Sequence, residues 1–230
     1  MSDYPSLKEL KAKGIKLLIF DLDGTLLDSM NVWNKVDIDF LGRYGYEVTP
    51  EYTDFVKRAS IDDAALYTQQ RYKIPLSPSG IIAEWDKMVS GFYKEEVELK
   101  PNVMKYLEEA KQLGFRLGVA TALTRNNAVS ALVKNKILEM FDAVITLEDV
   151  GKKIDKSSPD IFVKVLNYVN AGGSSVTPSQ TLVFDDVAAA ASGARNGGFL
   201  TCAVYDKIGC GDPLQWESFA AECDYSLREF

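Results

Sequence analysis

The chain of 230 residues contains no histidine, and this absence excludes several kinds of catalytic site. Ser/His/Asp and Cys/His relays need an imidazole to carry a proton, and His-ligated zinc sites need it as a metal ligand. Any catalysis by this chain therefore has to use carboxylates, lysine, hydroxyl groups or a metal that prefers oxygen ligands.

Cysteine is scarce as well. Cys202, Cys210 and Cys223 are odd in number, late in the chain and without CxxC spacing. This pattern favours neither a disulfide framework nor a zinc site. We expect the three thiols to be reduced and mostly structural.

Long apolar runs and an excess of positive charge are also missing. No run approaches the roughly 20 apolar residues that a membrane span needs, and the N-terminus is amphipathic and charged, unlike a signal peptide. The 26 Lys and Arg residues against 33 Asp and Glu residues give a net charge of −7, which opposes generic binding to nucleic acid or anionic lipid. We expect a cytoplasmic monomer or weak homodimer without a nucleic-acid or membrane partner.

The sequence does contain short apolar segments that alternate with helical patterns. We predict strands over 15–20, 115–121, 141–147, 181–186 and 199–205, and helices over 102–114, 126–138, 158–170 and 187–198. Alternation of this kind indicates βαβ units, and continuously apolar strands are typical of a parallel sheet buried on both faces. The predicted fold is α/β, with a doubly wound, Rossmann-like parallel sheet.

Residues 30–98 interrupt this alternation with four amphipathic helical patterns, at 31–45, 49–60, 62–72 and 77–97. We therefore predict a core domain made of 1–29 and 99–230, with an inserted all-helical cap domain at 30–98. Both linkers of the insertion should lie close together at the carboxyl edge of the sheet, where a cap can close over a ligand and exclude water.

The stretch DLDGT places Asp21 and Asp23 directly after the first strand, followed by Gly24 and Thr25. Residues two apart on an extended chain point to the same side, so both carboxylates face one pocket. Unless a cation lies between them, one carboxyl should hold its proton more tightly than the other. Oxygen ligands without His or Cys suit Mg²⁺. Asp185 and Asp186, which end the fourth predicted strand, fall on the same edge of the sheet.

Four ordered motifs resemble those of the haloacid dehalogenase (HAD) superfamily. They are DLDGT after the first strand, the Thr that ends GVAT, the Lys three residues before Pro-Asp in KSSPD, and VFDD before a helix of small residues. The resemblance covers nearly the whole chain. Its helical insertion is similar to the small α-helical cap of the subfamily that contains phosphatases and β-phosphoglucomutases.

The resemblance implies a role for each matching residue. Asp21 is the implied nucleophile, forming an aspartyl phosphate, and Asp23 is the implied general acid and base. Thr121 and Lys156 are expected to hold the phosphoryl oxygens. Asp186, with help from Asp185, is expected to bind Mg²⁺ together with Asp21 and the backbone carbonyl of Asp23. Asp185 has an alternative interpretation as the cap of the following helix.

The predicted substrate-binding residues come from both parts of the chain: Thr25, Ala122 and Arg125 from the core, and Lys57, Arg58 and Ser60 from a cap loop. Arg125 has the alternative of lying on a helix surface. The cap residues are those that the resemblance directs toward the site.

Several positions depart from the family's pattern. Lys156 is followed by two serines, so Lys152 and Lys153 are alternatives to it, and Val187 stands where relatives commonly have Ser or Thr. Trp33 occupies the region where the family's mutases carry a histidine.

The function predicted from these residues is Mg²⁺-dependent hydrolysis of a small phosphorylated metabolite. The alternatives are a phosphosugar mutase, which the missing histidine disfavours, and a phosphate-ligand binding protein that kept the fold without turnover. Asp23 favours phosphoryl transfer over dehalogenation, since dehalogenase relatives lack this second aspartate.

Overall fold

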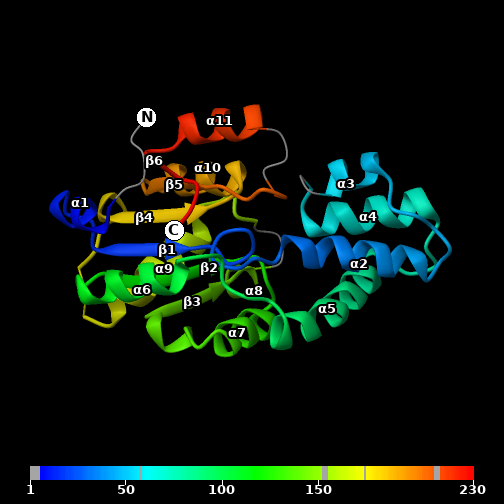
Figure 1. Cartoon of the computed structure of the whole chain (residues 1–230), viewed down its shortest axis with the longest axis horizontal. Helices are drawn as coiled ribbons and strands as arrows, with labels where there is room; N and C mark the ends of the chain where they lie inside the picture. Colours follow the sequence, from blue (N-terminus) through cyan, green and yellow to red (C-terminus); the bar gives the residue numbers. More distant parts are fainter. Residues whose placement is uncertain (1–5, 57–58, 152–154, 174, 210–212) are drawn as a thin grey trace.

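The computed structural model of the chain describes residues 6–56, 59–151, 155–173, 175–209 and 213–230. These residues contain a six-stranded parallel sheet with the order β3-β2-β1-β4-β5-β6 (Figure 1). The strands are β1 (Leu17–Phe20), β2 (Arg116–Thr121), β3 (Ala143–Thr146), β4 (Thr181–Asp185), β5 (Leu200–Val204) and β6 (Tyr225–Leu227). The predicted fold class is confirmed, and β6 is an additional strand that the sequence did not predict.

Strand β1 lies between β2 and β4, and its register brings the three strand ends to one level. Phe20 is paired with Val119 of β2 and with Phe184 of β4. The N–H of Asp21 then donates to the carbonyl of Phe184 at 3.0 Å. The residues that follow these strands therefore share the carboxyl edge of the sheet, where parallel sheets place their ligands.

Strand β1 is apolar throughout because both faces of the sheet are covered. Leu18 and Phe20 pack in a cluster with helix α6 (Val103–Gln112), whereas Leu17 and Ile19 pack in a second cluster with helix α9 (Asp160–Ala171). The remaining elements around the sheet are α1 (Leu7–Ala12), α7 (Arg125–Lys134), η1 (Leu138–Met140), α8 (Leu147–Val150), η2 (Pro178–Gln180), α10 (Ala188–Asn196) and α11 (Pro213–Glu222). Across the described residues, no helix has the length and hydrophobicity needed to cross a bilayer.

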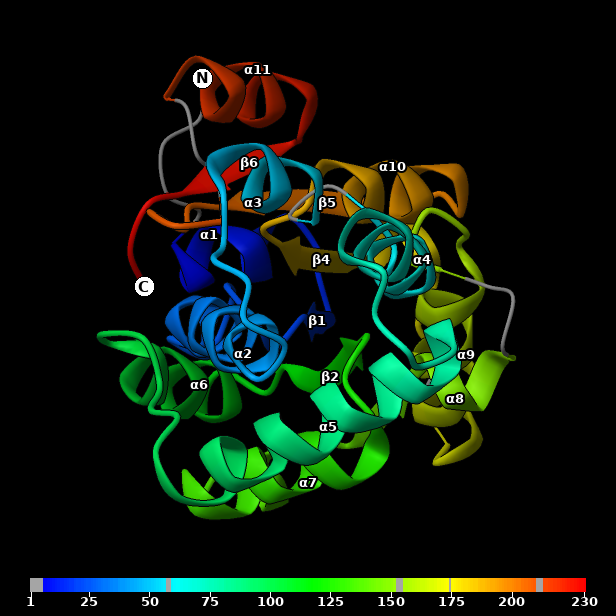
Figure 2. The same ribbon diagram turned by 90° about the vertical axis from the view of Figure 1, so that its right-hand side faces the viewer.

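The predicted helical insertion contains helices α2 (Met30–Gly42), α3 (Pro50–Val56), α4 (Ile61–Tyr72) and α5 (Pro78–Glu95), and no strand among its described residues. Helix α5 begins where Ser77 accepts a hydrogen bond from the N–H of Gly80 and Pro78 occupies the first turn, a common helix start. Figure 2 views the molecule from the side on which these four helices lie, with the sheet behind them. Whether 30–98 is a separate domain with those boundaries stays a prediction.

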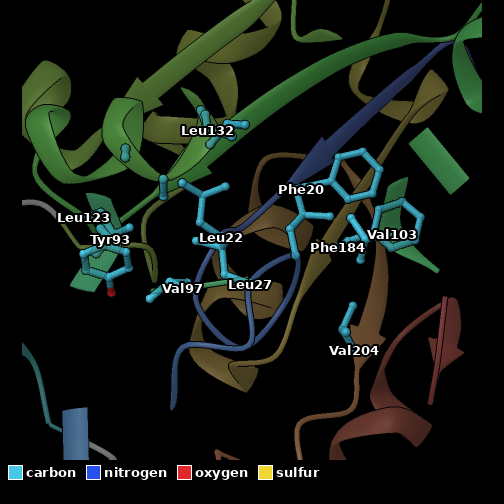
Figure 3. Packing of buried hydrophobic residues seen from close by; sticks show 14 of the residues in the cluster. Phe20, Leu22, Leu27, Tyr93, Val97, Val103, Leu123, Leu132, Phe184 and Val204 are labelled. Atoms are coloured by element: carbon cyan, nitrogen blue, oxygen red, sulfur yellow. The ribbon is translucent and has the colours of Figure 1, made fainter. Parts of the chain in front are cut away.

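The two connections between the helical insertion and the sheet lie side by side, as predicted. Leu27 and Leu99 form an antiparallel bridge, and the N–H of Asp28 donates to the carbonyl of Glu98 at 3.0 Å. Leu22 and Leu27 from the loop after β1 lie near Val97 and Tyr93 in Figure 3. Both connections are thereby fixed to the loop that carries the DLDGT motif.

Candidate active site

Three of the predicted site residues end neighbouring strands. Asp21 follows β1, Thr121 ends β2 and Asp185 ends β4, and their side chains are buried. A buried carboxylate needs a cation or hydrogen-bond donors to offset its lost hydration. The surroundings of Asp21 and Asp185 are therefore informative.

Lys156 supplies that cation. Its Nζ lies 2.7 Å from Asp21 Oδ1 and 2.5 Å from Asp185 Oδ2, although Lys156 is 29 residues before Asp185 and 135 after Asp21. Only 12% of the lysine side chain is exposed. The alternatives Lys152 and Lys153 lie outside the described residues, so the comparison among the three lysines stays open.

The charges of this group perturb one another strongly. Burial alone would lower the pKa of Lys156, but the charges of Asp185 and Asp21 raise it above its ordinary value. Burial raises the pKa of Asp185 to about 6 against the attraction of Lys156. Burial, followed by the charges of Asp185 and Asp21, raises the pKa of Asp186 well above its usual range. If all three carboxyls were ionised, the group would carry more negative charge than Lys156 alone can balance.

A divalent cation fits this excess of negative charge. Among the described residues, Asp21, Asp185 and Asp186 offer ligand oxygens that all lie within 4.8 Å of one another. These ligands are all carboxylate oxygens, which Mg²⁺ prefers. The side chain of Asp23 is not part of this group, and the predicted contribution of its backbone carbonyl stays a prediction.

The backbone conformation and the surroundings of Gly24 explain why the motif needs a glycine after its second aspartate. Its φ of +71° lies in the left-handed region, and a Cβ at this position would stand 2.2 Å from Asp186 Oδ2. Any other residue would be strained and would also collide with the carboxylate. The next residue, Thr25, is fully buried and its hydroxyl donates to Asp186 Oδ1 at 3.5 Å. The motif therefore contains Asp21 and also contacts the carboxylate of Asp186.

Asp185 has one contact on each oxygen. Oδ1 accepts the N–H of Val187 at 3.0 Å, a local turn contact, while Oδ2 pairs with Lys156. Helix α10 has Val187 as its N-cap residue and no side-chain cap hydrogen bond, so the alternative of Asp185 as the cap of that helix is not supported, while its role as a metal ligand stays a prediction. Val187 is half exposed.

Asp23 is held separately, by donors at the start and the end of the helical insertion. Ser29 donates to Oδ1 at 2.6 Å, and the hydroxyl of Tyr93 lies 2.8 Å from Oδ1 and 2.7 Å from Oδ2. The indole N–H of Trp33 donates to Oδ2 at 3.4 Å. Burial raises the pKa of Asp23 to about 6, opposed by these three donors, and the charge of Asp21 contributes a smaller increase. Burial is thus the main reason why Asp23 holds its proton tightly, rather than the paired carboxylate expected from the sequence.

The loop after β2 follows the strand that is paired with β1, so it begins next to Asp21. Thr121 Oγ1 accepts the N–H of Leu123 at 3.2 Å, and Ala122 between them is exposed. Arg125 pairs with Asp149 and donates to the carbonyl of Val144 at 3.3 Å. Its guanidinium is therefore engaged near β3 and α8, and binding of substrate by Arg125 stays a prediction.

The predicted cap residues are described only in part. Ser60 is the N-cap of α4, accepting from the N–H of Asp63 at 3.1 Å and donating to its carboxylate at 2.8 Å. Lys57 and Arg58 lie outside the described residues. Their predicted roles in binding substrate remain untested.

Two glycines, one in helix α10 and one at its C-cap, lie where the loop that carries Lys156 packs directly on the helix. A Cβ on Gly193 would stand 2.2 Å from the carbonyl oxygen of Lys156, and one on Gly197 would stand 2.8 Å from Pro159 Cβ. The small-residue helix after VFDD therefore allows Lys156 to reach the strand ends.

Sequence reasoning missed four residues around the site: Ser29, Tyr93, Lys100 and Asp206. Ser29 could have been found from its position just after DLDGT. Tyr93 had no such signal, since it lies 70 residues from Asp23 and fits the apolar pattern of α5. Lys100 forms an ion pair with Asp206 at 2.8 Å, which no local pattern indicates.

The fold and this set of residues define a class of protein. A family model of haloacid dehalogenase-like hydrolases matches residues 18–204, which is most of the chain. The chain therefore belongs to the haloacid dehalogenase-like hydrolases, and the resemblance found from the four motifs is confirmed.

The individual relatives share about a quarter of their residues with this chain. The chain is 26% identical over 210 residues to protein CbbY of Rhodobacter capsulatus, covering 86% of this chain and 88% of the relative. It is 25% identical over 199 residues to validoxylamine A 7'-phosphate phosphatase of Streptomyces hygroscopicus subsp. limoneus, covering 80% and 82%. The crystal structure of CbbY from Rhodobacter sphaeroides in complex with phosphate has a TM-score of 0.76 and 20% identity over 93% of each chain. The last likeness shows the shared fold.

Proposed function

We propose that the protein is a Mg²⁺-dependent phosphomonoester hydrolase that acts on a small phosphorylated metabolite through an aspartyl-phosphate intermediate. The observation that carries this proposal is the contact of Lys156 with both Asp21 and Asp185, next to Asp186. This contact supports the proposal because it brings together, at one edge of the sheet, a carboxylate that could act as nucleophile, a cation that could bind phosphate and carboxylates that could bind a metal.

In this proposal, Asp21 attacks phosphorus and Lys156 neutralises charge on the phosphoryl oxygens, with Thr121 as a hydroxyl donor. Mg²⁺ bound by Asp21, Asp185 and Asp186 would offset the carboxylate charge and that of the phosphate. Asp23 has a different environment from these groups. Its pKa of about 6 lets it hold a proton for the leaving oxygen and later accept one from water.

The identity of one neighbour of Asp23 favours hydrolysis over a phosphosugar mutase. Trp33, which stands in the region where the family's mutases have histidine, donates its indole N–H to Asp23. An indole nitrogen is a donor only and cannot take up a proton. A carboxylate and water must therefore carry the proton transfers near this position.

The phosphatase relative and the neighbour that binds phosphate support a phosphorylated substrate. Release of inorganic phosphate from an aryl phosphate with Mg²⁺ tests the proposal. We expect activity that a chelator removes, that Asp21→Asn abolishes, and that Asp39→Asn, an exposed change on α2, leaves intact. A panel of phosphorylated metabolites then identifies the substrate class.

The outcomes separate the three functions. Binding of a phosphorylated ligand without release of phosphate would indicate a binding protein. Interconversion of sugar phosphates without release would indicate a mutase. Either result contradicts the hydrolase.

A further inference from the structure

Asp186 lies between two glycines from distant parts of the chain. A Cβ on Gly24 would stand 2.2 Å from Asp186 Oδ2, and a Cβ on Gly209 would stand 3.1 Å from the same oxygen. One glycine belongs to the loop after β1 and the other to the loop after β5. The position of the Asp186 carboxylate therefore depends on both loops staying in place.

Lys100 connects these two loops. Its Nζ donates to the carbonyl of Gly24, donates to the carbonyl of Tyr205 at 3.0 Å, and pairs with Asp206 Oδ2 at 2.8 Å. The three N–H groups of an ammonium are matched by three acceptors. The side chains of Lys100 and Asp206 are 14% and 6% exposed, so the ion pair is largely removed from water.

Asp206 extends this connection to Gly209. Its Oδ1 accepts the N–H of Gly209 at 2.6 Å and the N–H of Ile208 at 2.8 Å. A continuous set of contacts therefore runs from the Gly24 carbonyl through Lys100 and Asp206 to Gly209. Both ends of this set, Gly24 and Gly209, lie against the carboxylate of Asp186.

Lys100 also stands at the end of the helical insertion. Its backbone N–H donates to the carbonyl of Leu26 at 2.9 Å, next to the bridge between Leu27 and Leu99. The backbone of Lys100 is thus fixed to the loop after β1, and its side chain reaches the loop after β5. One residue joins the metal side of the site to the connection with the insertion.

We propose that Lys100 is a positioning residue for the metal ligand Asp186, acting through the Gly24 carbonyl and Asp206. The inference rests on the proposed function, because it concerns the Mg²⁺ site of that function. Residues that orient metal ligands typically change metal affinity or activity by about 10–100-fold when they are removed.

The direction of the effect separates positioning from simple charge. Lys100 is a positive charge near the acidic group, so its removal should strengthen Mg²⁺ binding if charge alone acted. If Lys100 instead holds the two loops around Asp186, its removal should weaken Mg²⁺ binding. Opposite outcomes are therefore expected from the two explanations.

Titration of the full-length protein with MgCl₂ by calorimetry measures this affinity without turnover. We expect Lys100→Met to bind Mg²⁺ about tenfold more weakly, and Lys100→Arg to lie between it and the wild type. Lys134→Met is the matched control. Lys134 pairs with Glu98 and donates to the carbonyl of Val97 on the same linker, without touching either loop, and should bind Mg²⁺ like the wild type.

Lys100→Met leaves the buried Asp206 without its cation, which can impair folding. The double variant Lys100→Met with Asp206→Asn removes this charge and keeps an oxygen that can accept from Ile208 and Gly209. We expect it to fold and still to bind Mg²⁺ more weakly. In assays of phosphate release, both variants should need more Mg²⁺ for half-maximal rate, with an unchanged KM for substrate at saturating Mg²⁺.

Unchanged or tighter Mg²⁺ binding by Lys100→Met, or recovery of wild-type affinity in the double variant, would overturn the proposal. So would a wild-type protein that binds no Mg²⁺. A wild type that binds Mg²⁺ but releases no phosphate contradicts only the proposed function, since the calorimetric comparison is independent of turnover.

Discussion

The hydroxyl of Tyr93 lies between the two oxygens of Asp23, 2.8 Å from Oδ1 and 2.7 Å from Oδ2. Burial, and after it the charge of Asp23, raises the pKa of Tyr93 well above its usual value, so the phenol stays protonated and can only donate to the carboxylate. A residue at the end of the helical insertion thereby stabilises the ionised form of the predicted general acid, against the larger effect of burial.

We expect Tyr93→Phe to raise the pKa of Asp23 above about 6, because one of the donors that lowers it is lost. The proposed reaction needs Asp23 protonated, so the alkaline limb of the profile of kcat/KM against pH should move upward, by about one pH unit. The exposed Tyr168→Phe serves as the control. A limb that stays in place or moves downward would contradict the role of Tyr93.

Lys156→Met should reduce both the activity and the thermal stability of the protein. We expect a loss of about 100-fold or more in kcat/KM, together with a lower melting temperature at neutral pH, since Asp21 and Asp185 lose their shared cation. Calorimetry and a phosphate-release assay measure both effects. Lys105→Met, an exposed lysine on α6, should change neither. Activity retained in Lys156→Met would return the role to Lys152 or Lys153.

Gly193→Ala tests the contact between α10 and the loop of Lys156. The added Cβ would stand 2.2 Å from the carbonyl oxygen of Lys156, so the loop has to shift. We expect a loss of about 1–3 kcal/mol in the free energy of unfolding and a reduced kcat. Gly91→Ala in α5 is a matched control with nothing within 4 Å of the new Cβ, and should be neutral or slightly stabilising. Equal effects of the two changes would show that packing at Gly193 is unimportant.

Asp37 in the helical insertion provides a test by pH. Burial raises its pKa to about 6, although its Oδ1 accepts a hydrogen bond from Tyr52 at 3.0 Å. The folded protein thus binds this proton more tightly than the unfolded chain, whose value is near 3.8. The contribution of Asp37 to the free energy of unfolding therefore falls as the pH rises from about 3.8 to about 6, and it stays low above that range.

Asp37→Asn removes the ionised form and keeps an oxygen that can accept from Tyr52. We expect it to raise the melting temperature at about pH 8 and to have little effect at about pH 4, where the wild-type carboxyl binds its proton in the folded protein. Asp39→Asn, exposed on the same helix, should show no such difference between the two pH values. Stabilisation that is equal at both pH values would contradict the buried charge as its cause.

Much of the fold could be predicted because buried parallel strands form continuous apolar runs in the sequence. Leu17 to Phe20 are apolar without interruption since both faces of the sheet are covered, and β4 is likewise buried along its length, with an apolar centre from Leu182 to Phe184. Strand β6 was missed because it has three residues, of which Tyr225 and Ser226 are only partly buried. Strand β3 is shorter than predicted because η1 precedes it and Thr146 already caps α8 with Asp149.

Some residues of the candidate site could likewise be predicted from the sequence, and others could not. Asp21, Asp185 and Lys156 could be picked out because each stands at a motif tied to a strand end or a following helix. The residues that control them could not: Tyr93 meets Asp23 through the packing of α5, and Asp206 meets Lys100 across 106 residues. Such pairs depend on tertiary packing, which hydrophobic periodicity does not encode.

The bridge between Leu27 and Leu99 has a consequence for engineering. The chain leaves and re-enters the sheet region at two points that are hydrogen-bonded across an antiparallel pair, so their Cα atoms are about 5 Å apart. A two-residue Asn-Gly turn is enough to join such a pair into a hairpin. The intervening helices could thus be exchanged for another insertion, or omitted, without rerouting the polypeptide around the loop that carries the DLDGT motif.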